Sequence, residues 1–266
     1  MSSIAHLTDA VETLLMESGS DLPRAARQRC VLFVLGVLLA DRSALRRVAP
    51  TYATIALGAT TAVSHERRLR RTLHAPHLGQ AVPMYGRVVR RILRRLPPTH
   101  CLWLIIDESG HSDVVRRLVA ALWYRGRAVP LTWLSWPAQP PVGEHDWRDC
   151  QTLLAQLAAL FPAEQPITIL ADRACGCPAC CDLVVALGWD AVLRAQRQTR
   201  LRLADGREQA LTALLSQPGT RWLGSGWAFK KQGWRAVSVV PYWRAGCKAP
   251  LLLVSHRVPC WALVRE

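Results

Sequence analysis

Two short apolar segments of this chain each run directly into an aspartate. Residues 102–107 read LWLIID and residues 167–172 read ITILAD. Apolar runs of this length are typical of strands in a sheet that is covered by helices. Functional groups gather at the carboxyl ends of such strands. If the two strands are neighbours, the carboxylates of Asp107 and Asp172 lie side by side.

Two nearby carboxylates repel each other unless a cation lies between them. Mg²⁺, or Mn²⁺ in its place, prefers oxygen ligands and often uses one or two carboxylates together with substrate phosphate. Paired metal ions support phosphodiester chemistry. Asp107 and Asp172 are therefore candidate metal ligands and catalytic residues. The structural alternatives are a helix cap at Asp107 and an ion pair between Asp172 and Arg173, and Arg173 is also a candidate phosphate contact.

The element pattern around these acids predicts an α/β domain at residues 99–198. After Pro97 and Pro98, strands are expected at 101–107, 114–124, 128–136, 167–171 and 189–195, with helices at 146–161 and 177–187. The order is β-β-β-α-β-α-β. Arg125-Gly126-Arg127 is a hairpin turn candidate. Ser109 and His111, after Asp107, either line the site or form a turn, and a turn is expected.

Residues 1–96 are predicted to be helical and to carry a strongly basic surface. The chain has a net charge of +15, and residues 64–96 hold nine arginines and one acid. The apolar residues Val88, Val89, Ile92, Leu93 and Leu96 are expected on one helix face and the arginines on the other. The candidate DNA contacts here are Arg67, Arg68, Arg70, Arg71, Arg90, Arg91, Arg94 and Arg95.

Such a charge surplus points to double-stranded DNA or another polyanion, because an arginine fork binds two phosphate oxygens. A solvated face on a core helix and a protein bound to an acidic membrane surface are the alternatives. Residues 199–266 are rich in glycine and tryptophan and predict a small, mostly β segment. Lys230 and Lys231 are further candidate DNA contacts in that segment.

The cysteines indicate a reducing compartment. The chain has nine cysteines, an odd number, and begins without a secretory signal pattern, so reduced thiols in a cytoplasm are expected. Cys175, Cys177, Cys180 and Cys181 form C-x-C-x-x-C-C. A zinc site is one interpretation, and small apolar residues at the start of a packed helix are the other. A nucleophilic cysteine with His111 or His256 is a third interpretation.

IIDES with HSDVVRRLVAALWYRGRAVPLTW, and ILADRACG with LGWDAVLRAQR, resemble the DDE transposases of bacterial insertion sequences. The insertion-sequence-four group is the most similar one, and the resemblance covers nearly the whole chain. It implies a ribonuclease-H-like mixed sheet with a helical N-terminal DNA-binding region and a β-rich insertion. It also implies metal-dependent cleavage at the inverted repeats of the element and transfer of the 3′ hydroxyl to target DNA, in a nucleoid-associated homodimer.

The resemblance is incomplete at the third acid. In this group a glutamate lies in Tyr-x-x-Arg-x-x-x-Glu-x-x-x-x-x-x-Lys, and Tyr52, Tyr85, Tyr124 and Tyr242 do not begin that pattern. Glu266 is the last residue and a poor candidate. The expectation is a chain that ends before the last catalytic helix. A DNA-binding remnant or repressor without catalysis, and another ribonuclease-H-like nuclease, are the alternative functions.

Overall fold

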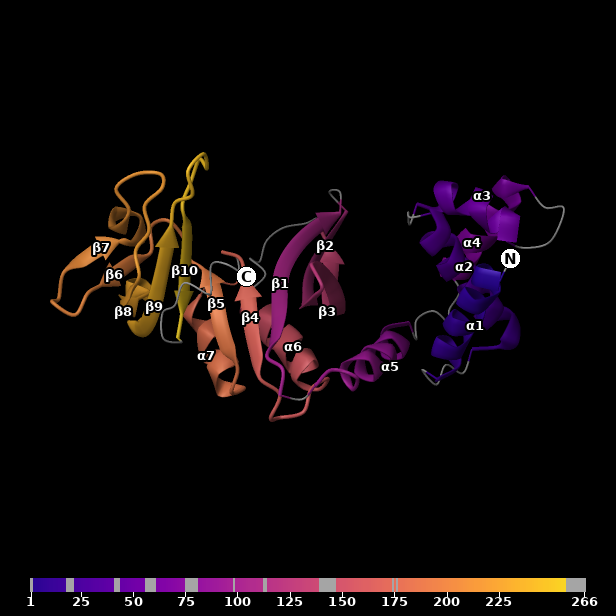
Figure 1. Ribbon diagram of the computed structural model, residues 1–266, viewed down its shortest axis with the longest axis horizontal. Helices are drawn as coiled ribbons and strands as arrows, with labels where there is room; N and C mark the ends of the chain where they lie inside the picture. The colour runs from indigo at the N-terminus through magenta and orange to yellow at the C-terminus, as the bar shows by residue number, and fades with distance from the viewer. Residues whose placement is uncertain are drawn as a thin grey trace. The chain divides into compact units, whose positions relative to one another are not determined.

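The structure is a computed structural model with two compact units, residues 1–95 and residues 96–266. It describes residues 2–17, 22–40, 44–55, 61–74, 81–97, 99–111, 114–138, 147–173, 175 and 177–256. We call residues 1–95 the helical unit and residues 96–266 the sheet unit. Figure 1 shows the elements of each unit along the chain.

Helices make up the helical unit, as the sequence predicts. They are α1 (Ser2–Glu17), α2 (Arg24–Ala40), α3 (Leu45–Ile55), α4 (Ala62–Leu73) and α5 (Ala81–Leu93). One core cluster joins α1 and α2 through Val11, Leu15, Val31 and Leu35. A second cluster centres on Val48 of α3 and Leu69 of α4. Burial of these apolar stripes fixes which helix faces remain in solvent.

The sheet unit is built on a ten-stranded mixed sheet with the order β3-β2-β1-β4-β5-β10-β9-β8-β6-β7. Its first strands are β1 (Leu102–His111), β2 (Val115–Tyr124), β3 (Arg127–Pro137), β4 (Ile167–Ala171) and β5 (Asp190–Arg194). The rest are β6 (Arg200–Arg202), β7 (Glu208–Ala210), β8 (Gly224–Ala228), β9 (Arg235–Tyr242) and β10 (Leu251–Ser255). The predicted β-β-β-α-β-α-β order is confirmed.

Two helices, α6 (Trp147–Ala158) and α7 (Pro178–Ala186), cover one face of the sheet. They contact each other, α6 also contacts β2 and β3, and α7 contacts β5. Leu104, Ile106, Ile169 and Leu193 are fully buried, and the strand register places them on the same face of the sheet. Side chains alternate between the two faces of a sheet, so these four residues lie under α6 and α7.

Strand β1 extends further than the sequence predicts. It was expected to end at Asp107, with Ser109 and His111 in a turn, and that expectation was wrong. β1 continues to His111 because antiparallel pairing with β2 continues to the pair His111↔Val115. The predicted hairpin turn is confirmed: Arg125 and Gly126 have φ of 50° and 77°. Positive φ at both positions is what a two-residue turn between twisted strands requires.

Residues after β5 continue the same sheet. β10 pairs antiparallel with β5, and β9, β8, β6 and β7 follow toward the edge, with short 3₁₀ turns at Leu211–Leu214 and Lys230–Gln232. β8 lies close to β6, since a Cβ at Gly226 would lie 2.5 Å from the backbone oxygen of Arg202. The Arg202 guanidinium lies 5.5 Å and 4.7 Å from the ring centroids of Trp227 and Trp234. The edge thus combines close backbone contact with cation–π contacts.

Candidate functional site

The register between strands β1 and β4 places the two aspartates beside each other in the sheet. β1 and β4 are parallel neighbours, as the hypothesis of adjacent carboxylates required, and their last paired residues are Ile106 and Ala171. Asp107 and Asp172 each come directly after that pair. The carboxylates therefore occupy equivalent positions on neighbouring strands, at the point where the parallel pairing ends.

Both aspartates lie on the face of the sheet opposite α6 and α7. Ile106 is fully buried under the helices, so Asp107 points to the other face by strand alternation. Asp107 and Asp172 are exposed, and the Asp172 side chain retains 52% of its accessible surface. Asp107 lies within β1, pairing with Val119 of β2, rather than at the strand end that the sequence predicts.

Arg194 joins the two acids at the end of β5, and the sequence analysis did not identify it. Ala171 pairs with Leu193, so Arg194 follows in register beside Asp172. Arg194 Nη1 lies 3.5 Å from Asp172 Oδ1, and Arg194 Nε is buried without a hydrogen-bond partner. The available signal was Arg194 ending a short apolar run, as the two aspartates do.

The carboxylate oxygens of Asp107 and Asp172 are chemically suited to bind a hard divalent cation. Two exposed carboxylates on adjacent strands offer the oxygen ligands that Mg²⁺ and Mn²⁺ use, with room for water and phosphate. Within the described ranges, no group of three or more histidine, cysteine, aspartate or glutamate side chains has an arrangement that could hold a metal ion. Glu266, the weak candidate for a third acid, lies outside the described residues. The described part of the site is thus a two-carboxylate site with an adjacent arginine.

Helix α4 presents four of the sequence-predicted arginines to solvent. Leu69 is buried in the core, and the arginines around it are exposed. They are Arg67, Arg68, Arg70 and Arg71. Arg70 Nη2 lies 3.1 Å from Glu66 Oε1, an exposed pair one helical turn apart. The buried leucine fixes the rotation of α4, so the basic face is set by core packing.

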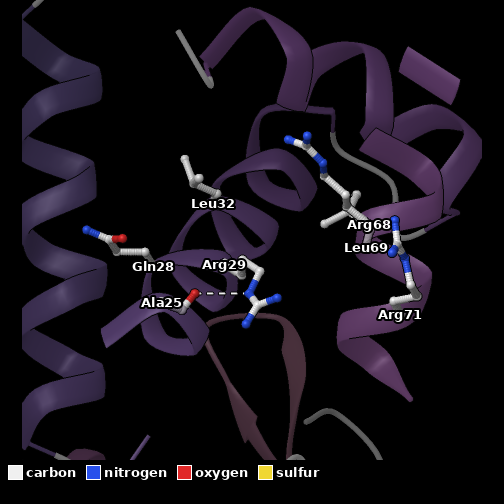
Figure 2. A pocket seen from close by; sticks show the side chains of 7 residues that line it. All are labelled: Ala25, Gln28, Arg29, Leu32, Arg68, Leu69 and Arg71. Atoms are coloured by element: carbon white, nitrogen blue, oxygen red, sulfur yellow. Dashed lines mark hydrogen bonds between the residues drawn. The ribbon is translucent and has the colours of Figure 1, made fainter. Parts of the chain in front are cut away.

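A pocket of about 650 Å³ lies between α2 and α4 (Figure 2). Arg29 of α2 and Arg68 and Arg71 of α4 line it, together with Ala25, Gln28, Leu32 and Leu69. The Arg29 Nε donates to the backbone oxygen of Ala25 at 3.0 Å, which holds the side chain along its own helix (Figure 2). Arg29 was not among the predicted DNA contacts, because those in the helical region were taken from the arginine-rich residues 64–96.

Helix α5 and the turn that follows it carry the second group of predicted arginines. Arg90, Arg94 and Arg95 are exposed, whereas Arg91 forms an ion pair with Glu17 of α1. Val89 and Leu93 are buried, but Ile92 is 45% exposed, so the predicted apolar face was wrong at Ile92. A side chain at that position faces the arginine side of the helix, and Arg91, Ile92 and Arg95 line a pocket with residues of α1.

The remaining candidate phosphate contacts differ in their surroundings. Arg173 is half-buried, and its Nε has no hydrogen-bond partner. Lys230 Nζ lies 2.6 Å from Glu208 Oε2, whereas Lys231 is exposed. The charge of Lys230 is therefore largely balanced within the sheet edge.

The cysteine hypotheses have different outcomes. Cys180 is buried and Cys181 is half-buried, as expected for adjacent positions on a helix packed against a sheet. Among the described residues, no group of three or more cysteine, histidine, aspartate or glutamate side chains could hold a zinc ion. His256 Nε2 lies 3.1 Å from Asp190 Oδ1, at the start of β5 and so at the opposite end of that strand from Arg194. His111 has no described side chain.

Comparison with known protein families and with curated proteins finds no match for this chain. None of the helices in the described ranges has the length and apolar character needed to cross a membrane.

Proposed function

We propose that the chain is a DNA transposase of the insertion-sequence-four type, with a ribonuclease-H-like sheet and a metal-dependent strand-cleavage site. The observation that carries the proposal is the pairing of Ile106 with Ala171 on parallel neighbouring strands. That register gives Asp107 and Asp172 equivalent positions beside each other. The motif resemblance around both aspartates adds the reaction class.

In this proposal Asp107 and Asp172 hold the divalent cation. A bound Mg²⁺ would polarise the phosphodiester and lower the pKa of an attacking water. The two carboxylates orient the cation at the open face of the sheet. Arg194, beside Asp172, offers a guanidinium fork to a phosphate oxygen when DNA occupies the face.

The arginines of the helical unit hold DNA in this proposal. Exposed Arg67, Arg68, Arg70 and Arg71 on α4, and the pocket that adds Arg29, form a basic surface that suits the phosphates of double-stranded DNA. The inverted repeats of the element and its target DNA are the proposed ligands. A homodimer on DNA is proposed from the resemblance alone.

A nicking assay tests the enzyme directly. Purified protein is incubated with supercoiled plasmid and Mg²⁺ or Mn²⁺, and Asp107→Asn and Asp172→Asn are compared with Asp205→Asn. Asp205 is an exposed acid that pairs with Arg207 in the β6–β7 turn, so it is a matched control. We expect nicking by the parent and the control and its loss in both site variants. Equal nicking by all four proteins would contradict the assignment of the site.

A DNA-binding protein without catalysis is the second candidate. The observation in its favour is that, among the described residues, no group of three or more histidine, cysteine, aspartate or glutamate side chains could hold a metal ion. DNA binding without nicking by the parent, in either metal, is the result that selects this candidate. Nicking without any joining of a 3′ end to a second DNA molecule instead selects a nuclease of the same fold.

A further inference from the structure

Three cysteines from separate segments meet on the helix-covered face of the sheet. Cys150 lies on α6, Cys175 in the turn after β4, and Cys180 on α7. All three are buried. The Sγ atoms of Cys150 and Cys175 are 3.3 Å apart, and Cys180 is within hydrogen-bonding reach of Cys150. α6 contacts β2 and β3, α7 contacts β5, and the two helices contact each other, so the buried cluster is part of the core.

Hydrogen bonds within the cluster favour a thiolate on Cys150. The thiols of Cys175 and Cys180 lower the pKa of Cys150, against the opposing effect of burial. The hydrogen bond with Cys150, and then burial, raise the pKa of Cys180. A thiolate is the nucleophilic form of cysteine. A second thiol next to it can act as the resolving cysteine, which attacks the sulfenic acid to form a disulfide.

We propose that Cys150 and Cys175 are a redox-active pair that forms a reversible disulfide with a peroxide as the oxidant. Cys150 Sγ attacks one peroxide oxygen, the O–O bond breaks, and water leaves after protonation, so Cys150 becomes a sulfenic acid. Cys175 Sγ then attacks the Cys150 sulfur. The S–S bond forms, the S–O bond breaks, and hydroxide leaves and takes up the Cys175 proton as water. Two thiols lose two electrons, and the peroxide becomes two waters.

The pair connects to the acids through the turn after β4. The backbone N–H of Cys175 donates to the backbone oxygen of Asp172 at 3.0 Å. Disulfide formation would shorten the Sγ–Sγ distance from 3.3 Å to about 2.05 Å and tie that turn to α6. Oxidation would thereby restrict the segment that carries Asp172. An effect on DNA cleavage rests on the proposed function, but the disulfide itself does not.

Peptide mapping of the peroxide-treated full chain tests the pair without any activity assay. Trypsin separates residues 149–173, whose only cysteine is Cys150, from residues 174–194, which hold four. After treatment with hydrogen peroxide and blocking of free thiols, we expect these two peptides to be disulfide-linked and to separate on reduction. Each of Cys150→Ser and Cys175→Ser should abolish the link. Cys180→Ser and the exposed-site control Cys247→Ser should retain it.

Three results would overturn the proposal. One is a link between the two peptides that survives Cys175→Ser, because it would assign another partner to Cys150. Another is a Cys150 that keeps its thiol in the parent protein under peroxide conditions that oxidise Cys247. The third is one equivalent of zinc that co-purifies with the chain and is released by Cys150→Ser, which would make the cluster a metal site. Thiol counting on the untreated parent checks that all of these cysteines start reduced.

Discussion

Arg194 Nη1 lies 3.5 Å from Asp172 Oδ1, so one of the two proposed metal ligands already has a cationic partner. A divalent cation at Asp172 competes with that guanidinium for the carboxylate. Exposed ion pairs of this kind are worth about 0.2–1 kcal/mol. In the proposed site, this pair would therefore tune the affinity for metal rather than block metal binding.

Replacing Arg194 with alanine should strengthen metal binding. Loss of a competing pair worth up to about 1 kcal/mol corresponds to a decrease in the Kd for Mn²⁺ of up to about fivefold. Isothermal titration calorimetry with Mn²⁺ on the full chain measures the change. Arg207→Ala removes a guanidinium that pairs with Asp205 in a distant turn and serves as the control. Weaker metal binding by Arg194→Ala than by the control would refute the competition.

DNA affinity should fall steeply with salt and should depend on the α2–α4 pocket. Each phosphate neutralised contributes about 0.9 to the slope of log K against log salt. Arg68→Gln with Arg71→Gln should reduce that slope by about two units, and Arg29→Gln should reduce it further. Fluorescence anisotropy with duplex DNA from 50 to 200 mM salt is the measurement, with Arg207→Gln as the control. An affinity that hardly changes over that range would rule out phosphate binding as the main contribution.

Leu69→Ala should destabilise the helical unit alone. Leu69 is 1% exposed and packs in the cluster with Val48, and removing such a leucine costs about 2–5 kcal/mol. Leu73→Ala changes the same helix at a position that is 44% exposed and should cost much less. All eleven tryptophans lie at or after Trp103, so fluorescence reports on the sheet unit and circular dichroism on both.

In urea, Leu69→Ala should therefore shift part of the circular dichroism transition and leave the fluorescence transition in place. A coincident shift of both signals would mean that the two units unfold together. No shift in either signal would contradict the burial of Leu69.

Two glycine-to-alanine substitutions should change the stability of the fold in opposite directions. Gly226→Ala places a Cβ 2.5 Å from the backbone oxygen of Arg202, and overpacking of this kind costs about 1–3 kcal/mol. Gly86 lies inside α5 with open space around its Cα, so Gly86→Ala should stabilise that helix by up to about 1 kcal/mol. Thermal unfolding by circular dichroism compares the two variants. A neutral Gly226→Ala would show that β6 and β8 are further apart than described.

Much of the sheet could be predicted from the sequence because its central strands are short apolar runs bounded by turn residues. The order of elements from β1 to β5 follows from that pattern. That β1 and β4 are neighbours could not be predicted from apolar periodicity alone, because periodicity does not determine the order of strands in a sheet. The extension of β1 to His111 was missed because Ser109 and Gly110 have low strand propensity, and pairing with β2 overrides it.

The site residues that were missed all depend on contacts between distant segments. Arg194 reaches Asp172 only because β5 lies beside β4, and Arg29 reaches Arg68 and Arg71 only because α2 packs against α4. Cys150 lies 25 positions before Cys175, outside the C-x-C-x-x-C-C motif. A sequence motif identifies residues that are close along the chain, whereas the residues in each of these three arrangements are far apart in the sequence.

The central claim is that Asp107 and Asp172 share one divalent cation, and a double-mutant cycle on Mn²⁺ binding tests it most directly. Asp107→Asn, Asp172→Asn and the double variant are titrated with Mn²⁺, with Asp205→Asn as the control. If both carboxylates hold one ion, each single variant should weaken binding at least about tenfold, and the double variant should add much less than the sum of the two losses. Fully additive losses, or unchanged binding in either single variant, would contradict a shared ion.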